Sequence, residues 1–131
     1  MIEGINRVEV MSLFVEDLTS ARRFYLDTLG LPLVFEDGAC TVVKFENLMI
    51  NVLQAAHAPE LVAPLRAAPP DTGPRFMLTI LVENVDRLYA QLRSRGVAFL
   101  NGPLDRPWGR RTAAFADPAG NVWEIAHKLM Q

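Results

Sequence analysis

The 131-residue sequence contains a single cysteine, Cys40, and lacks long apolar runs. A single cysteine excludes an intrachain disulfide framework and a thiolate metal cluster. No window approaches the roughly 18 apolar residues of a membrane-spanning helix, and the first residues lack the positive stretch and apolar core of a signal peptide. We therefore expect a cytoplasmic protein that has no membrane partner.

The sequence also lacks a basic stripe, because its thirteen basic and fifteen acidic residues are spread along the chain and give a net charge of −2. Neutralising the phosphates of a nucleic acid requires clustered positive charge, so no nucleic acid partner is expected. Half of the residues are apolar. That share and the chain length fit one compact domain, residues 1–131, with a real hydrophobic core.

The first half of the chain alternates strand-like and helix-like patterns. Residues 8–15 are rich in β-formers with a two-residue period, which predicts a strand. Asp17 then stands where a carboxylate caps a helix, and the helical spacing of apolar residues ends at Gly30. Favourable turn residues separate three further short strands, which we expect near residues 32–36, 40–45 and 48–53.

The same order returns in the second half. Residues 13–18 resemble residues 80–85 at an offset of 67, and Asn84 precedes a second amphipathic helix that ends at Gly96. Strands are predicted near residues 97–100, 111–115 and 122–126, with turns at Gly102-Pro103 and at residues 117–121. The chain is therefore interpreted as two modules, residues 5–56 and 75–131, joined by a proline-rich linker, residues 57–74.

A four-stranded sheet that packs one helix leaves its other face uncovered, so two such halves side by side can curl around a shared groove. The predicted fold class is α+β, with two tandem βαβββ modules that form a curved mixed sheet around a ligand groove. The face away from the helices is expected to carry Val10, Ser12 and Phe14 in the first half and Met77, Thr79 and Leu81 in the second.

The C-terminal half contains the most specific motif of the sequence. It runs through Arg106-Pro107-Trp108-Gly109-Arg110, Phe115, Asp117-Pro118-Ala119-Gly120-Asn121 and Val122-Trp123-Glu124-Ile125. Together with the duplicated modules, this motif resembles the vicinal oxygen chelate superfamily, which includes glyoxalases, extradiol dioxygenases, fosfomycin resistance enzymes and bleomycin resistance proteins. The resemblance covers nearly the whole chain and looks strongest for the bleomycin resistance branch, and it implies a homodimer.

In metal-dependent members, the resemblance implies four ligands, one on the first and one on the last strand of each half. The corresponding residues here are Val10, Asn51, Met77 and Glu124. Only Glu124 suits a hard metal ion, because valine has no lone pair, a thioether prefers soft ions and a lone amide carbonyl is a weak ligand. We therefore expect no metal and no other cofactor, with Glu124 as the only metal ligand if an atypical site exists.

Several candidate residues have two interpretations. Glu124 and His127 have the spacing of a helical ligand pair, but on a strand their side chains face opposite ways. Trp108 either fills the end of the sheet or stacks on a planar heterocycle.

Arg110 or Arg111 either contacts a ligand or is a solvated charge at a strand edge. Glu124 is either a groove carboxylate for a cationic or hydrogen-bonding ligand, or is satisfied by polar neighbours such as Asn51 and Thr79.

The favoured function is metal-independent binding of a planar or cationic small molecule, with sequestration of a bleomycin-like antibiotic, and hence resistance, as its concrete form. The alternatives are a lyase, isomerase or dioxygenase of the same superfamily that uses Glu124 as a base or an unusual metal, and a scaffold whose groove holds no small ligand. The residues expected to contact the ligand are Phe14, Phe35, Asn51, Met77, Trp108, Arg110, Phe115 and Glu124.

Overall fold

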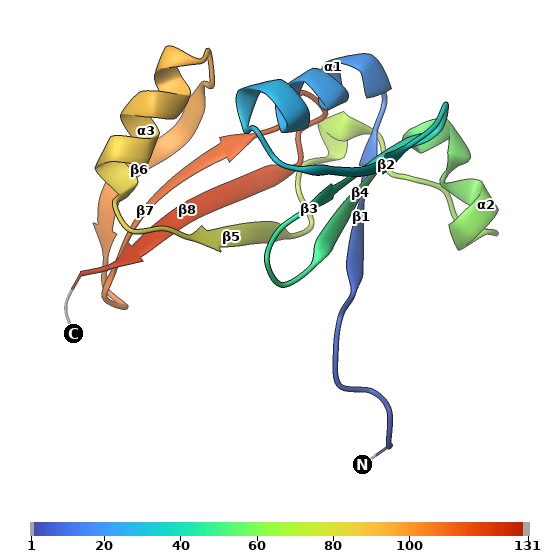
Figure 1. Ribbon diagram of the computed structural model, residues 1–131, viewed down its shortest axis with the longest axis horizontal. Helices are drawn as coiled ribbons and strands as arrows, with labels where there is room; N and C mark the ends of the chain where they lie inside the picture. Colours follow the sequence, from blue (N-terminus) through green and yellow to red (C-terminus); the bar gives the residue numbers. More distant parts are fainter. Residues whose placement is uncertain (1, 130–131) are drawn as a thin grey trace. The chain divides into compact units, whose positions relative to one another are not determined.

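The computed structural model describes residues 2–129 of the chain, which divides into two compact units, Met1–Ala67 and Ala68–Gln131. The first unit contains β1 (Val10–Val15), α1 (Leu18–Arg22), the π-helical turn η1 (Arg23–Thr28), β2 (Leu33–Glu36), β3 (Cys40–Lys44), β4 (Met49–Gln54), the 3-10 turn η2 (Ala55–His57) and α2 (Pro59–Val62). The second contains the 3-10 turn η3 (Pro70–Thr72), β5 (Met77–Leu81), α3 (Val85–Ser94), β6 (Phe99–Arg106), β7 (Arg110–Ala116) and β8 (Val122–Lys128) (Figure 1).

Both units have the same sheet topology. The strand orders are β1-β4-β3-β2 and β5-β8-β7-β6, so the first and last strands of each module are neighbours. Those two strands run parallel, whereas the other pairs are antiparallel. The predicted α+β class with two βαβββ modules is confirmed, and the modules form two four-stranded mixed sheets.

One helix packs on one face of each sheet, α1 on the first and α3 on the second (Figure 1). In the first module, Leu13 and Val15 of β1 are buried together with Tyr25, which follows α1. In the second module, Trp123 and Ile125 of β8 are buried beneath α3. Burial of these apolar side chains is the main term that holds each helix to its sheet.

The predicted helix caps are confirmed in both modules. Oδ1 of Asp17 accepts hydrogen bonds from the backbone N–H groups of Thr19 and Ser20, at 3.1 and 3.3 Å. Oδ1 of Asn84 accepts the N–H of Arg87 at 3.0 Å. Each cap satisfies donors that the first helical turn leaves without a partner, which fixes where the chain turns from strand into helix.

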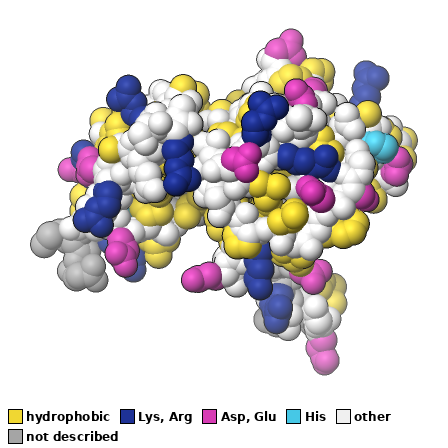
Figure 2. Space-filling model, turned by 45° about the horizontal axis from the view of Figure 1, so that its top comes forward, with side chains coloured by type: hydrophobic (Ala, Val, Ile, Leu, Met, Phe, Trp, Pro, Cys, Tyr) yellow, Lys and Arg dark blue, Asp and Glu magenta, His cyan; other side chains and the backbone are white. Residues whose placement is uncertain are grey.

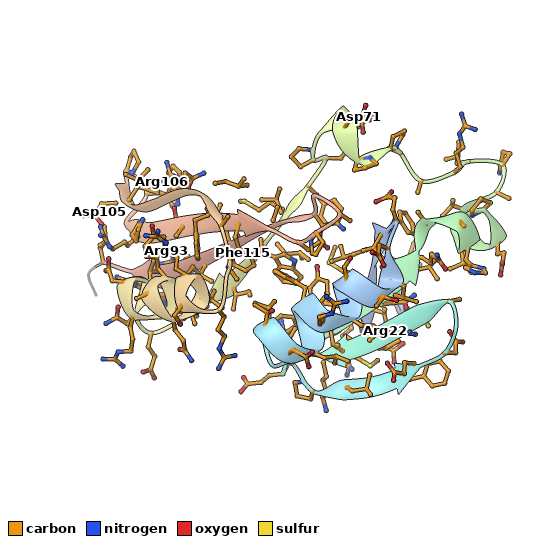
Figure 3. The ribbon with its side chains drawn as sticks, turned by 90° about the horizontal axis from the view of Figure 1, so that it is seen from above. Arg22, Asp71, Arg93, Asp105, Arg106 and Phe115 are labelled. Carbon is orange, nitrogen blue, oxygen red and sulfur yellow. The ribbon has the colours of Figure 1, made fainter. Side chains whose placement is uncertain are left out.

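An arginine also ties each helix to its sheet. Arg22 of α1 donates through Nε to Oγ1 of the buried Thr41 in β3, at 2.6 Å (Figure 3). In the second module the direction is reversed, because Arg111 of β7 reaches to Asp86 of α3 at 2.9 Å and to Asp105 of β6 at 2.8 Å. These contacts lie on the helix side of each sheet and leave the opposite face free of them.

The turn predicted at Gly102-Pro103 is wrong, since β6 continues through both residues to Arg106. The strand accommodates them with shifts in its register against β7, on either side of Asn101. Proline is tolerated there because β6 is an edge strand, where a missing N–H does not interrupt the sheet. The chain instead turns at residues 107–109.

Acidic and basic side chains are interspersed over the face of the molecule drawn in Figure 2. Within residues 2–129, no helix is both long enough and apolar enough to span a membrane.

Substitution of Gly102 by alanine is expected to destabilise the second module strongly. Gly102 has a φ of +88°, and an added Cβ would lie 2.5 Å from the carbonyl oxygen of Thr112. Gly109 is a matched control, because its φ is +82° but an added Cβ would meet nothing within 4 Å. In urea denaturation, Gly109→Ala should lose about 1–2 kcal/mol from backbone strain alone. Gly102→Ala should lose clearly more, and equal losses would contradict the proposed steric contact.

The ion pair between Arg111 and Asp86 predicts a pH-dependent stability. The hydrogen bond from Arg111 lowers the pKa of Asp86 below 3.8. Because the folded-state pKa is the lower one, the resulting stabilisation is present above about pH 3.8 and is lost as the pH falls through the folded-state value. Arg111→Gln should raise the pKa of Asp86 toward 3.8, as measured by NMR titration of its side-chain carboxyl carbon. Arg93→Gln, which removes a charge from α3, should leave that pKa unchanged.

Candidate functional site

Each sheet has one face turned away from its helix. In β1, Val10 and Ser12 are exposed, whereas Leu13 and Val15, on the other face, are buried. Met77, at the start of β5, exposes 48% of its surface. Alternation along the strands and their registers define two helix-free faces, which carry Val10, Ser12, Phe14, Phe35, Val42 and Asn51 in the first module and Met77, Thr79, Leu81, Arg110, Ala114 and Glu124 in the second.

A polar pair lies at the same point of each helix-free face. In the first module, Nδ2 of Asn51 donates to Oγ of Ser12 at 3.2 Å, and the two residues are register partners. In the second, Oγ1 of Thr79 donates to Oε1 of its register partner Glu124 at 2.9 Å. Ser12 and Thr79 are related by the 67-residue offset. The registers therefore confirm that Asn51 and Glu124 occupy corresponding positions.

The carbonyl oxygen of Asn51 has an unusual environment. This Oδ1 atom is buried and has no hydrogen-bond partner among residues 2–129. A buried acceptor without a partner costs about 1–3 kcal/mol. Exchanging the two ends of the amide would leave the amino group without a partner instead, because Ser12 still satisfies only one end. Asn51 therefore has one hydrogen-bonding group that no other group within residues 2–129 satisfies.

The residues at the four positions expected of a metal site do not fit a divalent ion. Val10 has no donor atom and Met77 offers only a soft thioether. The amide nitrogen of Asn51 is directed at Ser12, and one oxygen of Glu124 accepts a hydrogen bond. Across residues 2–129, no three His, Cys, Asp or Glu side chains form a group that could hold a metal ion. What these faces offer is hydrogen bonding, apolar contact and the charge of one carboxylate.

Glu124 and His127 point to opposite sides of β8, as the strand interpretation predicted. Glu124 binds Thr79 on the helix-free face, whereas Nδ1 of His127 accepts the backbone N–H of Val85 at 2.8 Å on the helix side. His127 thereby satisfies one N–H at the start of α3, in addition to the Asn84 cap. The two side chains do not form a ligand pair.

The turn between β6 and β7 presents Trp108 to solvent. Trp108 is 67% exposed, so its side chain does not fill the end of the sheet. Arg110, the first residue of β7, is half-buried and lies on the helix-free face. Arg111 faces the helix side, where Asp86 and Asp105 bind it. Of the two arginines that sequence analysis left open, only Arg110 lies on the helix-free face.

The expectation that Phe115 lies in the groove needs correction. Phe115 is completely buried and packs edge-on against Phe99, with ring centroids 5.4 Å apart, and Phe99 in turn contacts Tyr89 of α3. The two-residue alternation that places Arg110 on the helix-free face places Phe115 on the other. That alternation was available in the sequence and would have identified Phe115 as a core residue.

Phe35 and Asn51, in contrast, are brought into one row. Phe35 is the register partner of Val42, which is the partner of Asn51, so the three side chains lie side by side across β2, β3 and β4. Phe35 is 53% exposed and Phe14 of β1 is partly buried. Six of the eight expected contact residues thus lie on helix-free faces, while Trp108 lies in the turn and Phe115 in the core.

Sequence reasoning missed Arg106 and Lys128. Arg106 donates through Nε to Oγ1 of Thr112 at 2.9 Å and through Nη2 to Oδ1 of Asn101 at 3.2 Å. Arg106 and Lys128 are both register partners of Arg110. The mistaken turn at Gly102-Pro103 hid this register, so no sequence signal placed these side chains together.

The second module also has two open depressions at its edges. One, of about 450 Å³, is lined by residues of α3 and the segment before β6, including Tyr89 and Arg93, whose guanidinium lies 5.5 Å from the Tyr89 ring centroid. The other, of about 370 Å³, is lined by Leu81, His127 and Lys128 among others. Neither is lined by a residue that sequence analysis expected to contact the ligand.

Comparison with known proteins agrees with this architecture. Two relatives are similar over most of their length. YraH of Bacillus subtilis (strain 168) is 33% identical over 121 residues, which cover 89% of this chain and 94% of YraH. The virulence protein STM3117 of Salmonella typhimurium is 24% identical over 125 residues, 93% of this chain and 84% of that protein.

Solved structures with similar folds include a glyoxalase/bleomycin resistance protein/dioxygenase from Nocardioides, with a TM-score of 0.84 at 24% identity over 97% of this chain and 87% of that one. TnmS3, an antibiotic binding protein from Streptomyces sp. CB03234, has a TM-score of 0.74 at 27% identity over 97% and 99% of the two chains. A glyoxalase-related enzyme from Fulvimarina pelagi has a TM-score of 0.81 at 25% identity over 95% and 89%.

A family model matches residues 4–125, which is most of the chain and includes both polar pairs. On that match, the chain belongs to the Glyoxalase/Bleomycin resistance protein/Dioxygenase superfamily.

Proposed function

We propose that this protein binds a planar small molecule without a metal ion and thereby sequesters it, with bleomycin-like antibiotics as the form to test first. The observation that carries this proposal is the pair of helix-free faces, where exposed apolar side chains surround a polar pair at corresponding positions. An uncovered apolar surface with a few placed polar groups is the usual composition of a small-molecule site.

Each module exposes large side chains that a folded protein otherwise tends to bury. Phe35 in the first module, and Met77 and Trp108 in the second, expose about half or more of their surface. Aromatic and thioether side chains make favourable contacts with flat, polarisable rings. Burial of these side chains against a planar ligand would supply the apolar part of the binding free energy.

The polar pair of each helix-free face is rich in acceptors. In the first module, Oδ1 of Asn51 has no hydrogen-bond partner among residues 2–129. In the second module, Glu124 uses one carboxylate oxygen to accept from Thr79, which leaves the other to accept from a ligand. Each face, taken by itself, favours a ligand that carries N–H or O–H groups, and a charged donor would bind Glu124 most strongly. The 27% identity to TnmS3, an antibiotic binding protein, also supports this proposal.

A second candidate function is an enzyme of the superfamily that uses Glu124 as a general base. The 25% identity to a glyoxalase-related enzyme supports it, as does the hydrogen bond that fixes the orientation of the Glu124 carboxylate. The two candidates differ in whether the ligand leaves chemically changed.

Thermal denaturation with ligands and metals separates the two candidates. Bleomycin at 100 times its dissociation constant should stabilise the protein by about 2.7 kcal/mol, and Ni²⁺, Zn²⁺, Fe²⁺ or Mn²⁺ alone should leave the melting temperature unchanged. Metal stabilisation that a chelator reverses and that Glu124→Gln abolishes would overturn the metal-free proposal. Recovery of a chemically altered ligand, detected by mass spectrometry, would favour the enzyme.

Trp108 provides a direct test of the proposed site. Loss of indole stacking in Trp108→Ala should weaken binding of a planar ligand by about two- to thirteenfold, measured by calorimetry, because aromatic pairs contribute roughly 0.5–1.5 kcal/mol beyond area burial. Leu61→Ala is the control, since Leu61 is equally exposed but belongs to α2. Both variants should fold normally. Unchanged affinity in Trp108→Ala would remove the indole from the site.

A further inference from the structure

Three basic residues form a row across the helix-free face of the second sheet. Arg106 of β6 is the register partner of Arg110 in β7, and Arg110 is the partner of Lys128 in β8. Directly opposed residues project from the same face with Cβ atoms about 4.5–5.5 Å apart. Arg111, the next residue along β7, binds Asp86 of α3, which places the row on the face away from that helix.

This row has no acidic partner. Within residues 2–129, no carboxylate oxygen lies within 4.0 Å of the charged atoms of Arg106, Arg110 or Lys128. The contrast with the helix side is direct, because Arg111 there is paired with both Asp86 and Asp105. Like charges directly opposite one another destabilise a sheet. An anion bound to the row would offset that repulsion.

The guanidinium of Arg106 is oriented by hydrogen bonds that leave its charge available to such an anion. Arg106, which is labelled in Figure 3, is half-buried, and two neutral acceptors fix its guanidinium, the hydroxyl of Thr112 and the amide oxygen of Asn101. Neutral partners orient the group without cancelling its charge. The remaining N–H groups of a guanidinium match the geometry of a carboxylate or phosphate in two parallel hydrogen bonds.

Trp108 lies in the turn that joins Arg106 to Arg110. The backbone N–H of Gly109 donates to the carbonyl of Arg106 at 3.1 Å, and Leu129 donates to the carbonyl of Gly109 at the same distance. These bonds close the turn and keep Lys128 opposite Arg110. The exposed indole, Arg106 and Arg110 therefore belong to one short hairpin, and Lys128 of β8 lies opposite Arg110.

We propose that the row of Arg106, Arg110 and Lys128 binds an oxyanion, a carboxylate or a phosphate, carried by the planar ligand whose ring contacts Trp108. This inference rests on the proposed small-molecule function and narrows it, because the ligand is anionic at this end. Glu124 lies on the same face of β8, four residues before Lys128, or about 13 Å at the strand rise. A ligand that reaches both carries its hydrogen-bond donor at the opposite end from its anion.

The test follows the arginine Nε–Hε signals in ¹H–¹⁵N NMR spectra while benzoate, its neutral analogue benzamide, or pyrophosphate is added at constant ionic strength. Benzoate and pyrophosphate distinguish a carboxylate from a phosphate preference. At least one of the two anions should produce saturable shifts at Arg106 and Arg110, and benzamide should bind at least fivefold more weakly than the preferred anion. Shifts that do not saturate, or that appear equally with sodium chloride, would overturn the proposal.

Arg110→Gln is the decisive variant. The Arg110 side chain makes no hydrogen bond to other described residues, so its replacement leaves the hydrogen bonds of Arg106 to Thr112 and Asn101 in place. It should weaken binding of the preferred anion at least fivefold. Arg93→Gln is the matched control, since it removes the same charge from α3 of the same module and should leave affinity unchanged. Equal weakening of anion binding in both variants would show a general charge effect and contradict the proposed anion site.

The outcomes also separate this inference from the proposed function. If a planar antibiotic binds with an affinity that depends on Trp108 but not on Arg110, the proposed anion site is wrong and the proposed planar-ligand site is supported. If the anions bind the row while no planar ligand stabilises the protein, the row stands and the proposed function fails.

Discussion

The two sides of each sheet have different environments, and the rest of the structure depends on that difference. Successive side chains of a strand point to opposite faces, and each module has a single helix to cover one of them. The covered face collects most of the buried apolar residues together with the arginines that tie helix to sheet, Arg22 and Arg111. The other face carries side chains that the fold of its own module does not need, which makes it the place where function can reside.

The distribution of partners across β7 shows this division at the level of single residues. Arg111 has two carboxylates on the helix side, whereas its neighbour Arg110 lies between two other cations on the helix-free side. Paired charges on the helix side hold elements together. The cations on the open side hold no elements together, and their position opposite one another is the observation behind the proposed anion site.

The common topology of the two modules explains why the two faces resemble each other. The pairs Ser12 with Asn51 and Thr79 with Glu124 occupy the same ladder positions. One pair is neutral and leaves a buried acceptor open, whereas the other brings a carboxylate. Corresponding positions have thus acquired different hydrogen-bonding chemistry on a common backbone. This matches a superfamily in which one scaffold carries several functions.

The amino-acid sequence by itself determined the module order and the helix caps. These features depend on local periodicity, on capping side chains such as Asp17 and Asn84, and on the 67-residue offset between the halves, all of which can be read along the chain. The correspondence of Asn51 with Glu124 was implied by the family resemblance, and the strand registers confirm it. The same alternation also contained the correct side for Phe115, which is in the core and was expected in the groove.

Only the tertiary structure decided which side chains stand side by side across strands. The path of β6 through Gly102-Pro103 depends on a register shift against β7, and local turn propensity points instead to a turn. That register sets Arg106 and Lys128 on either side of Arg110. Cross-strand neighbours are fixed by long-range hydrogen bonding, because residues far apart in sequence become adjacent only once the ladder has formed.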